Sequence, residues 1–215
     1  MTALAAAVSA LLVGWGSLDY FRDVVRGRAD PRLASWSIWA CAMGIACAGA
    51  ARDGQLASAA VAGAGSVTCA AILIAGWRHG NREAGKLDAA GAAAGTCGLI
   101  LLGLALARPD LVPVPAAVAA SVLTDLAAFV PAWANGWGGE EPVLPYAKFA
   151  AAALIALSVT DIRVPAGVIY PAYELAACCV MIALIRAGQR SRARESPGSR
   201  QDAVALVLPS DGIPG

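Results

Sequence analysis

The chain has 215 residues, of which 59% are hydrophobic and only 14% charged, and its formal net charge is +1. Soluble domains carry about 25% charged residues, so this composition argues against a soluble globular domain. A nearly neutral chain also lacks the basic field that would attract nucleic acid.

Seven apolar stretches follow one another along the chain, each long enough to cross a hydrocarbon core about 30 Å thick. They cover residues 3–21, 33–51, 56–77, 87–107, 111–134, 143–160 and 164–186. No Lys or Arg precedes the first stretch, so we expect an uncleaved first helix rather than a secretory signal. The sequence therefore predicts an all-α integral membrane protein with seven transmembrane helices.

The basic residues outside these stretches predict the orientation. Twelve Lys and Arg lie in the loops after the odd-numbered stretches and in the C-terminal segment, whereas the opposite loops hold only Arg52, Arg108 and Arg163. Because cytoplasmic loops carry the excess of Lys and Arg, we expect the N-terminus outside and the C-terminus in the cytoplasm. The Ala- and Arg-rich composition suggests a bacterial protein of the cell (plasma or inner) membrane, with the lipid bilayer as its partner.

A faint internal repeat divides the chain. A shift of 110 residues places the first three stretches on the last three, and it sets Trp36 on Tyr146 and Trp39 on Phe149. A single connecting helix gives both triplets the same orientation, so we expect a 3+1+3 arrangement of two parallel triple-helix bundles. The predicted divisions are a first triple-helix repeat, a linker helix, a second triple-helix repeat and a disordered cytoplasmic tail, over residues 1–80, 81–110, 111–187 and 188–215.

One segment near the start of the chain carries a more specific pattern. Residues 18–28 read LDYFRDVVRGR, and Pro31 follows, then Ser35, Trp36 and Trp39. This pattern resembles PQ-loop/SWEET-like membrane proteins, especially their uncharacterised bacterial two-repeat relatives. The resemblance implies two triple-helix bundles around a central pathway, which carry a sugar, an amino acid or a related metabolite by alternating access.

The chain departs from that superfamily at two places. The Pro-Gln dipeptide that names the superfamily is absent; Phe21-Arg22 and Pro131-Ala132 stand at the matching positions. The asparagine that SWEET-type proteins use to bind sugar has no counterpart within a predicted span. These differences favour the alternative of a non-transporting membrane protein, such as a receptor, scaffold or accessory subunit, on the same fold.

Three ionisable residues lie inside predicted spans: Asp125, Lys148 and Glu174. Charged side chains within a membrane are costly and commonly mark a functional site. One interpretation makes Asp125 or Glu174 a site for a coupled proton or cation on the solute pathway. The other pairs one of these acids with Lys148 in a buried ion pair that only fixes helix packing.

Aromatic residues complete the predicted pathway. Trp36 and Trp39 lie where tryptophan anchors a helix at the membrane interface, or they stack on a solute. Tyr170 and Tyr173 flank a proline that frees a backbone carbonyl, as helices that line a cavity tolerate. The predicted solute pathway comprises Trp36, Trp39, Asp125, Tyr170, Tyr173 and Glu174.

Two prolines interrupt predicted spans. Pro131 lies in the fifth span and Pro171 in the seventh, and each removes one helical hydrogen bond. We expect both to act as hinges, with a simple packing kink as the other interpretation of Pro171.

Motifs for catalysis and for metal binding are missing from the sequence. His79 is the only histidine, and the six cysteines all fall inside predicted spans without a CxxC pair. We therefore expect no zinc or iron site, no cofactor and no enzymatic activity. A retinal protein is excluded because the seventh span has no lysine. Expected partners are the bilayer, a small-molecule solute and, in one interpretation, a proton; nucleic acid is not expected, and a homo-oligomer stays open.

Overall fold

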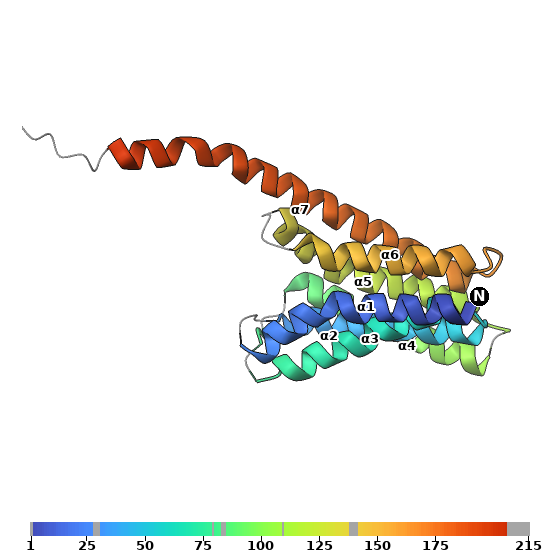
Figure 1. The fold of residues 1–215 in the computed structure, drawn as a ribbon. Coiled ribbons are helices and arrows are strands. Elements are labelled where there is room, and N and C mark those ends of the chain that lie inside the picture. The colour runs from blue at the N-terminus through green and yellow to red at the C-terminus, as the bar shows by residue number, and fades with distance from the viewer. Residues whose placement is uncertain are drawn as a thin grey trace, which may run out of the picture.

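The computed structural model describes residues 2–27, 31–78, 80–82, 85–108, 110–137 and 142–205. Within these residues the chain forms seven α-helices and, apart from an isolated bridge between Arg32 and Asn81, no β-structure. The helices, shown in Figure 1, are α1 (Thr2–Val25), α2 (Leu33–Arg52), α3 (Leu56–Gly76), α4 (Lys86–Ala107), α5 (Val114–Trp137), α6 (Val143–Val159) and α7 (Pro165–Ala205). The prediction of an all-α chain is confirmed, and every helix begins within three residues of its predicted start.

Five of these helices are long and apolar enough to cross a membrane, namely α1 to α4 and α7. The other two contribute shorter apolar stretches, Val114–Val130 in α5 and Val143–Val159 in α6. Large apolar side chains point outward, among them Leu11 at 72% exposed and Ile74 at 75% exposed. A soluble monomer rarely exposes so much apolar surface, so the helices indicate a multi-pass membrane protein.

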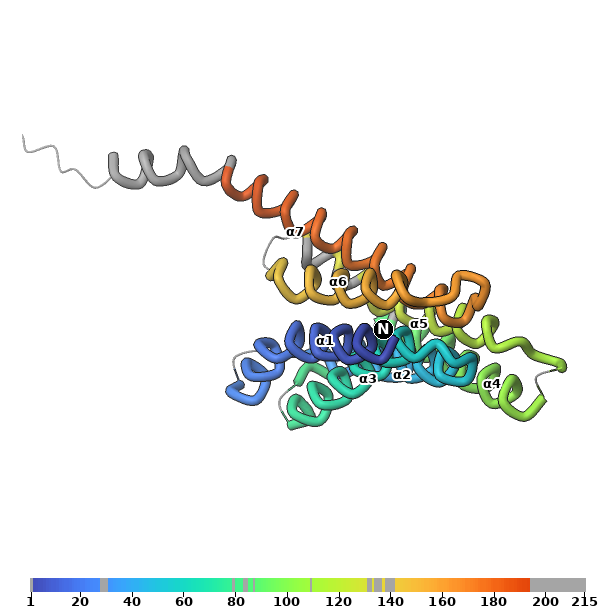
Figure 2. Tube along the Cα trace, turned by 45° about the vertical axis from the view of Figure 1, so that its right-hand side comes forward, coloured from blue at the N-terminus to red at the C-terminus, as the bar shows by residue number. Residues whose placement is uncertain are grey.

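The helices pack in a definite pattern (Figure 2). α3 contacts both α1 and α2, and α7 contacts both α5 and α6. Across the bundle α1 packs on α6, α2 on α5 and α3 on α7, while α4 lies against α5 and α2. Apart from α4, the pairs of described helices that contact each other form a symmetric pattern. If α1 trades places with α5, α2 with α6 and α3 with α7, the same pairs of helices are in contact.

Small residues form most of the contact surfaces between helices. Buried alanines include Ala42 in α2, Ala117 in α5 and Ala152 in α6, each at 0% exposed. In a membrane, helices associate through close packing rather than through the hydrophobic effect, and small side chains let their backbones approach. The Ala-rich composition is therefore the reason that these helices pack into one bundle.

Two glycines end helices in the left-handed region of backbone space. Gly27, with φ of 67°, follows α1, and Gly54, with φ of 73°, follows α2. A side chain is disfavoured at such a φ, so glycine allows the chain to turn directly after the helix.

The contact between α1 and α6 depends on a glycine. A Cβ atom placed on Gly16 would lie 2.7 Å from Cε1 of Phe149, whereas one on Gly14 would meet nothing within 4 Å. We expect Gly16→Ala to destabilise the bundle by about 1–3 kcal/mol through overpacking. Thermal unfolding in detergent measures this, and Gly14→Ala on the same helix is the matched control. Equal midpoints for the two variants would contradict the close α1–α6 contact.

The C-terminal segment differs from the expectation. The tail was predicted to be disordered from residue 188, whereas α7 is helical to Ala205 and extends past the start of α6 (Figure 1). Composition gives no reason for this helix, because Pro197 and Gly198 lie within it and both disfavour a helix interior. The predicted divisions of the chain stay predictions, and residues 206–215 lie outside its described part.

Candidate functional site

Two acidic side chains lie in the interior of the bundle. Asp125 is 11 residues after the first residue of α5, Val114, and 12 before the last, Trp137, so it lies at mid-helix. Glu174 belongs to α7. Asp125 is 0% exposed and Glu174 is 5% exposed. Buried acids of this kind need a hydrogen-bond donor or a positive charge as a partner.

Each acid has one oxygen bonded and one oxygen without a partner. The Tyr170 hydroxyl donates to Oδ1 of Asp125 over 3.3 Å, and the Cys178 thiol donates to Oε1 of Glu174 over 3.6 Å. Oδ2 of Asp125 and Oε2 of Glu174 are buried with no hydrogen-bond partner. The two acids are close enough to interact electrostatically, and both also interact with Cys69 of α3. The acid pair, Asp125 and Glu174, therefore lies where α3, α5 and α7 meet.

A continuous series of aromatic rings leads to the acid pair. Its central member is Phe129, whose ring centroid lies 5.6 Å from Trp39, 5.9 Å from Trp133 and 6.4 Å from Tyr173. Tyr173 lies 6.0 Å from Tyr170, which bonds Asp125.

The same series continues toward the loop between α1 and α2. Trp39 lies 5.1 Å from Trp36 in an edge-on arrangement, and Trp36 stacks on Tyr20 at 5.1 Å. The rings thus form one connected cluster, the aromatic series: Tyr20, Trp36, Trp39, Phe129, Trp133, Tyr170 and Tyr173.

Three donors in this cluster also lack partners. They are Nε1 of Trp39, Nε1 of Trp133 and the hydroxyl of Tyr173, and all three atoms are buried. Unsatisfied buried polar atoms are rare in folded proteins, and several together call for a ligand or for water. The arrangement can therefore bind a molecule that both accepts hydrogen bonds and meets the two acids.

Of the six residues predicted for the solute pathway, Trp36, Trp39, Tyr170 and Tyr173 belong to the aromatic series, and Asp125 and Glu174 form the acid pair. The sequence interpretation missed Phe129 and Trp133, although their spacing from Asp125 offered a signal. Residues four apart share one face of a helix, so Asp125, Phe129 and Trp133 form one stripe along α5. Tyr20 was missed as well; it enters the sequence analysis only within the segment 18–28 that carries the PQ-loop/SWEET-like resemblance.

Lys148 does not form the predicted ion pair. Its Nζ lies 4.0 Å from the centroid of the Trp15 ring on α1, and the free oxygens of the acid pair have no partner. α6 contacts α1, α3 and α7, whereas the described residues show no contact between α6 and α5, the helix of Asp125. Glu174 lies on α7, which α6 does contact, but the Lys148 side chain is directed to Trp15 of α1 instead. The interpretation of the acids as half of a buried ion pair with Lys148 is therefore wrong.

Pro171 contributes to a polar cluster at one end of the bundle. A proline cannot donate to the carbonyl four residues earlier, which here belongs to Gly167. Ser58 of α3 donates to that carbonyl over 2.7 Å, and its Oγ lies 2.8 Å from Oγ1 of Thr160 at the end of α6. We call Ser58, Thr160 and Gly167 the polar latch, which ties the first triplet of helices to the second. The backbone at Pro131 is helical, and its side chain lies outside the described residues.

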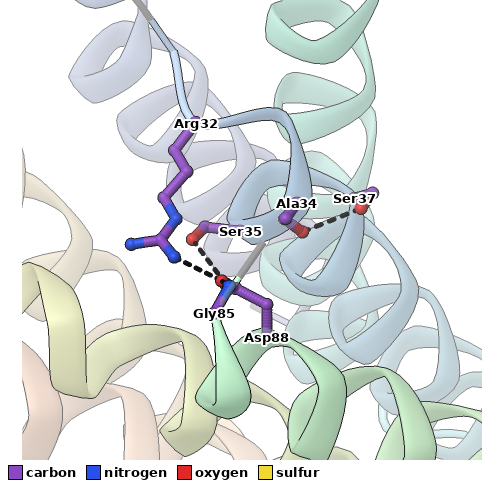
Figure 3. Close-up of polar contacts among 6 residues, drawn as sticks. All are labelled: Arg32, Ala34, Ser35, Ser37, Gly85 and Asp88. Carbon is purple, nitrogen blue, oxygen red and sulfur yellow. Dashed lines mark hydrogen bonds and ion pairs between the residues drawn. The ribbon is translucent and has the colours of Figure 1, made fainter. Parts of the chain in front are cut away.

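The opposite end of the bundle holds an ion pair between the partly exposed Arg32 and the buried Asp88 (Figure 3). Arg32, just before α2, contacts Asp88 in the first turn of α4 through Nη2, and Ser35 donates to Oδ1 of Asp88 over 3.5 Å. The Gly85 backbone N–H donates to Oδ2 of Asp88 over 2.7 Å, which caps α4. Asp88 is 3% exposed, so this contact fixes the start of α4 against the start of α2.

We expect Arg32→Ala to destabilise the protein by about 3 kcal/mol, since it leaves the buried Asp88 carboxylate without its counter-charge. Arg108→Ala is the matched control, because Arg108 pairs with Asp110 over 3.0 Å on the exposed surface. The Arg108 guanidinium lowers the pKa of the Asp110 carboxyl through this bond, yet exposed pairs add little stability. Thermal midpoints in detergent compare the variants, and equal losses for both would contradict the structural role of Arg32.

The described residues offer two other places to look for a site, a surface pocket and a possible metal-binding group, and neither supports a function. A pocket of about 440 Å³ at the end of α3 is lined by Leu73, Ile74, Ala75, Trp77 and Arg78, none of which is acidic. Among the described residues no group of three or more His, Cys, Asp or Glu side chains could hold a metal ion. His79 lies outside the described residues.

No protein-family model matches the sequence, and no curated protein or solved structure matches it either. The PQ-loop/SWEET-like resemblance therefore depends on the segment around Trp36 alone. A function for the chain has to be argued from the acid pair and its surroundings.

Proposed function

We propose that the chain is a seven-span carrier of PQ-loop/SWEET-like type that moves a small polar solute across a cell membrane by alternating access. One observation carries the proposal: the acid pair is enclosed at the meeting point of α3, α5 and α7, and each acid keeps an unpartnered oxygen. Ionisable residues at such depth mark substrate or proton pathways in membrane proteins. The acid pair is accordingly the site for the solute, for a coupled proton, or for both.

Two further observations support the 3+1+3 arrangement and the orientation. The helices of the second triplet start 112, 110 and 109 residues after those of the first, from Thr2 to Val114, Leu33 to Val143 and Leu56 to Pro165. The exchange symmetry of the helix contacts agrees with this regular offset. The distribution of basic residues, twelve against three, favours an external N-terminus and a cytoplasmic C-terminus.

The alternative function, a non-transporting receptor, scaffold or accessory subunit, is favoured by a different observation. Asp125 and Tyr170 are almost completely buried, at 0% and 2% exposed, so the site is closed to water. A carrier has to open this site to each side in turn, whereas a structural bundle keeps it closed.

The two functions differ in whether water reaches the centre of the bundle. Cys178, bonded to Glu174, is 0% exposed, and Cys69 is 5% exposed. We expect a membrane-impermeant methanethiosulfonate reagent to modify these two thiols in intact proteoliposomes, as located by mass spectrometry. Cys97 and Cys179, exposed on the outer surface of the bundle, face lipid and serve as controls that stay unmodified. Protection of Cys69 and Cys178 until the protein is unfolded would overturn the carrier proposal.

A further inference from the structure

We propose that the solute of this site is a small organic cation: an ammonium ion that also carries an uncharged oxygen acceptor, as an amino alcohol does. This inference rests on the proposed carrier function, since it names the solute class for the same site. It is argued from the charge of the acid pair, the aromatic rings beside it and the unpartnered donors around it.

The acid pair favours a cation as the ligand. Among the described residues, no Lys or Arg forms an ion pair with Asp125 or Glu174, and Lys148 lies over Trp15 instead. Two carboxyl groups that lie close together in a medium of low dielectric constant do not both stay ionised without a compensating positive charge; at least one of them takes up a proton. An ammonium ion allows both carboxyl groups to ionise and pairs with them, an interaction that a neutral sugar does not offer.

The aromatic series favours an organic cation over a metal ion. The Phe129 ring centroid lies 5.6 Å from that of Trp39 and 6.4 Å from that of Tyr173, and Tyr173 lies 6.0 Å from Tyr170, which bonds Asp125. Aromatic faces attract ammonium groups, and such rings are the usual walls of sites for quaternary amines. Mg²⁺ and Ca²⁺ demand six or more oxygen ligands, which two carboxylates and a set of rings do not supply.

The unpartnered donors indicate an acceptor on the same ligand. The indole N–H groups of Trp39 and Trp133 and the Tyr173 hydroxyl can all donate, and none has a partner. A hydroxyl oxygen on the ligand can accept from them. A carboxylate on the ligand would instead bring a negative charge beside two acidic groups, in a site that has no fixed positive charge, so a zwitterion fits less well than a net cation.

The test measures binding of choline to the purified full-length chain by isothermal titration. We expect saturable binding of choline, and at least tenfold weaker binding of 3,3-dimethylbutan-1-ol, its uncharged isostere, and of glycine betaine, its zwitterionic analogue. Glu174→Gln and Trp39→Leu should each weaken choline binding at least tenfold. Trp39→Phe, which keeps an aromatic ring, should retain binding within about threefold. The control is Trp77→Leu, at an exposed tryptophan directly after α3, and it should leave choline binding unchanged.

Three results would overturn the inference: choline and its uncharged isostere bind alike, betaine binds as tightly as choline, or choline binding survives both Glu174→Gln and Trp39→Leu. Thermal midpoints of all variants separate loss of binding from loss of folding. If choline binds as expected but is not taken up by proteoliposomes, the ligand class holds and the carrier function fails. If Cys69 and Cys178 become modified but no choline binds, the carrier function holds and the ligand class fails.

Discussion

Replacing Glu174 by glutamine is expected to lower solute-coupled proton movement at least tenfold. Glutamine retains an oxygen that can accept from the Cys178 thiol, so the local packing is preserved. It cannot take up or release a proton, and it removes one of the two acidic groups at the centre of the bundle. Asp125→Asn should have a similar effect, because an amide oxygen can still accept from Tyr170.

The measurement uses proteoliposomes that contain a pH-sensitive dye and receive, in turn, a series of sugars, amino acids and amines. Lys148→Gln is the matched control, since it neutralises the third ionisable residue of the predicted spans, which lies over Trp15 and away from the acids. We expect its flux to stay within twofold of the wild-type value. Unchanged flux in both acid variants would remove the acid pair from the mechanism.

Much of the fold was predictable because its signals are local. The length of each apolar stretch and the polar residues between stretches set the helix limits, and all seven helices begin close to their predicted positions. The two acids were also predictable, since an ionisable residue inside an apolar stretch stands out in any membrane sequence. Tyr170 and Tyr173 were identified for a related reason, their position around a proline in a predicted span.

The misses concern contacts between helices that are distant along the chain. The pairing of Lys148 with an acid failed because no local pattern shows that α6 makes no contact with α5, or that the Lys148 side chain lies over Trp15 of α1. Phe129 and Trp133 looked like ordinary apolar residues until Trp39 and Tyr173 were found beside them. Residues on the surface between helices acquire their chemistry from their neighbours, and only the tertiary structure identifies those neighbours.

The polar latch is likewise a contact between helices that are distant along the chain. The sequence predicted that Pro171 would free a carbonyl one turn earlier, but it could not predict the donor. In the structure Ser58, on the opposite triplet, donates to the freed carbonyl of Gly167. The predicted hinge at Pro171 is thereby joined to the contact between α3 and the helices α6 and α7 at this end. Bending α7 at Pro171 and parting the triplets would be one movement, because the same carbonyl takes part in both.

Joining the latch covalently should therefore stop transport. The Oγ of Ser58 and Oγ1 of Thr160 lie 2.8 Å apart, so cysteines at these two positions converge closely enough to form a disulfide. We expect oxidised Ser58→Cys/Thr160→Cys protein to lose at least nine-tenths of its solute uptake, and reduction with dithiothreitol to restore it. Full uptake by the crosslinked protein would show that the triplets do not separate at this end.

Two controls make the result specific to the latch. The single variant Ser58→Cys, treated with the same oxidant, should keep its uptake. This variant controls for oxidation of the native cysteines and for loss of the hydrogen bonds that the Ser58 hydroxyl makes. In the oxidised double variant, the impermeant reagent should reach Cys178 only from the end of the bundle that holds Arg32 and Asp88, whereas in the reduced protein it should reach Cys178 from both ends. A crosslinked latch closes one end of the bundle and leaves the other end free to open, so alternating access predicts modification of Cys178 from one end only. In a permanently open pore, the crosslink would leave modification from both ends unchanged.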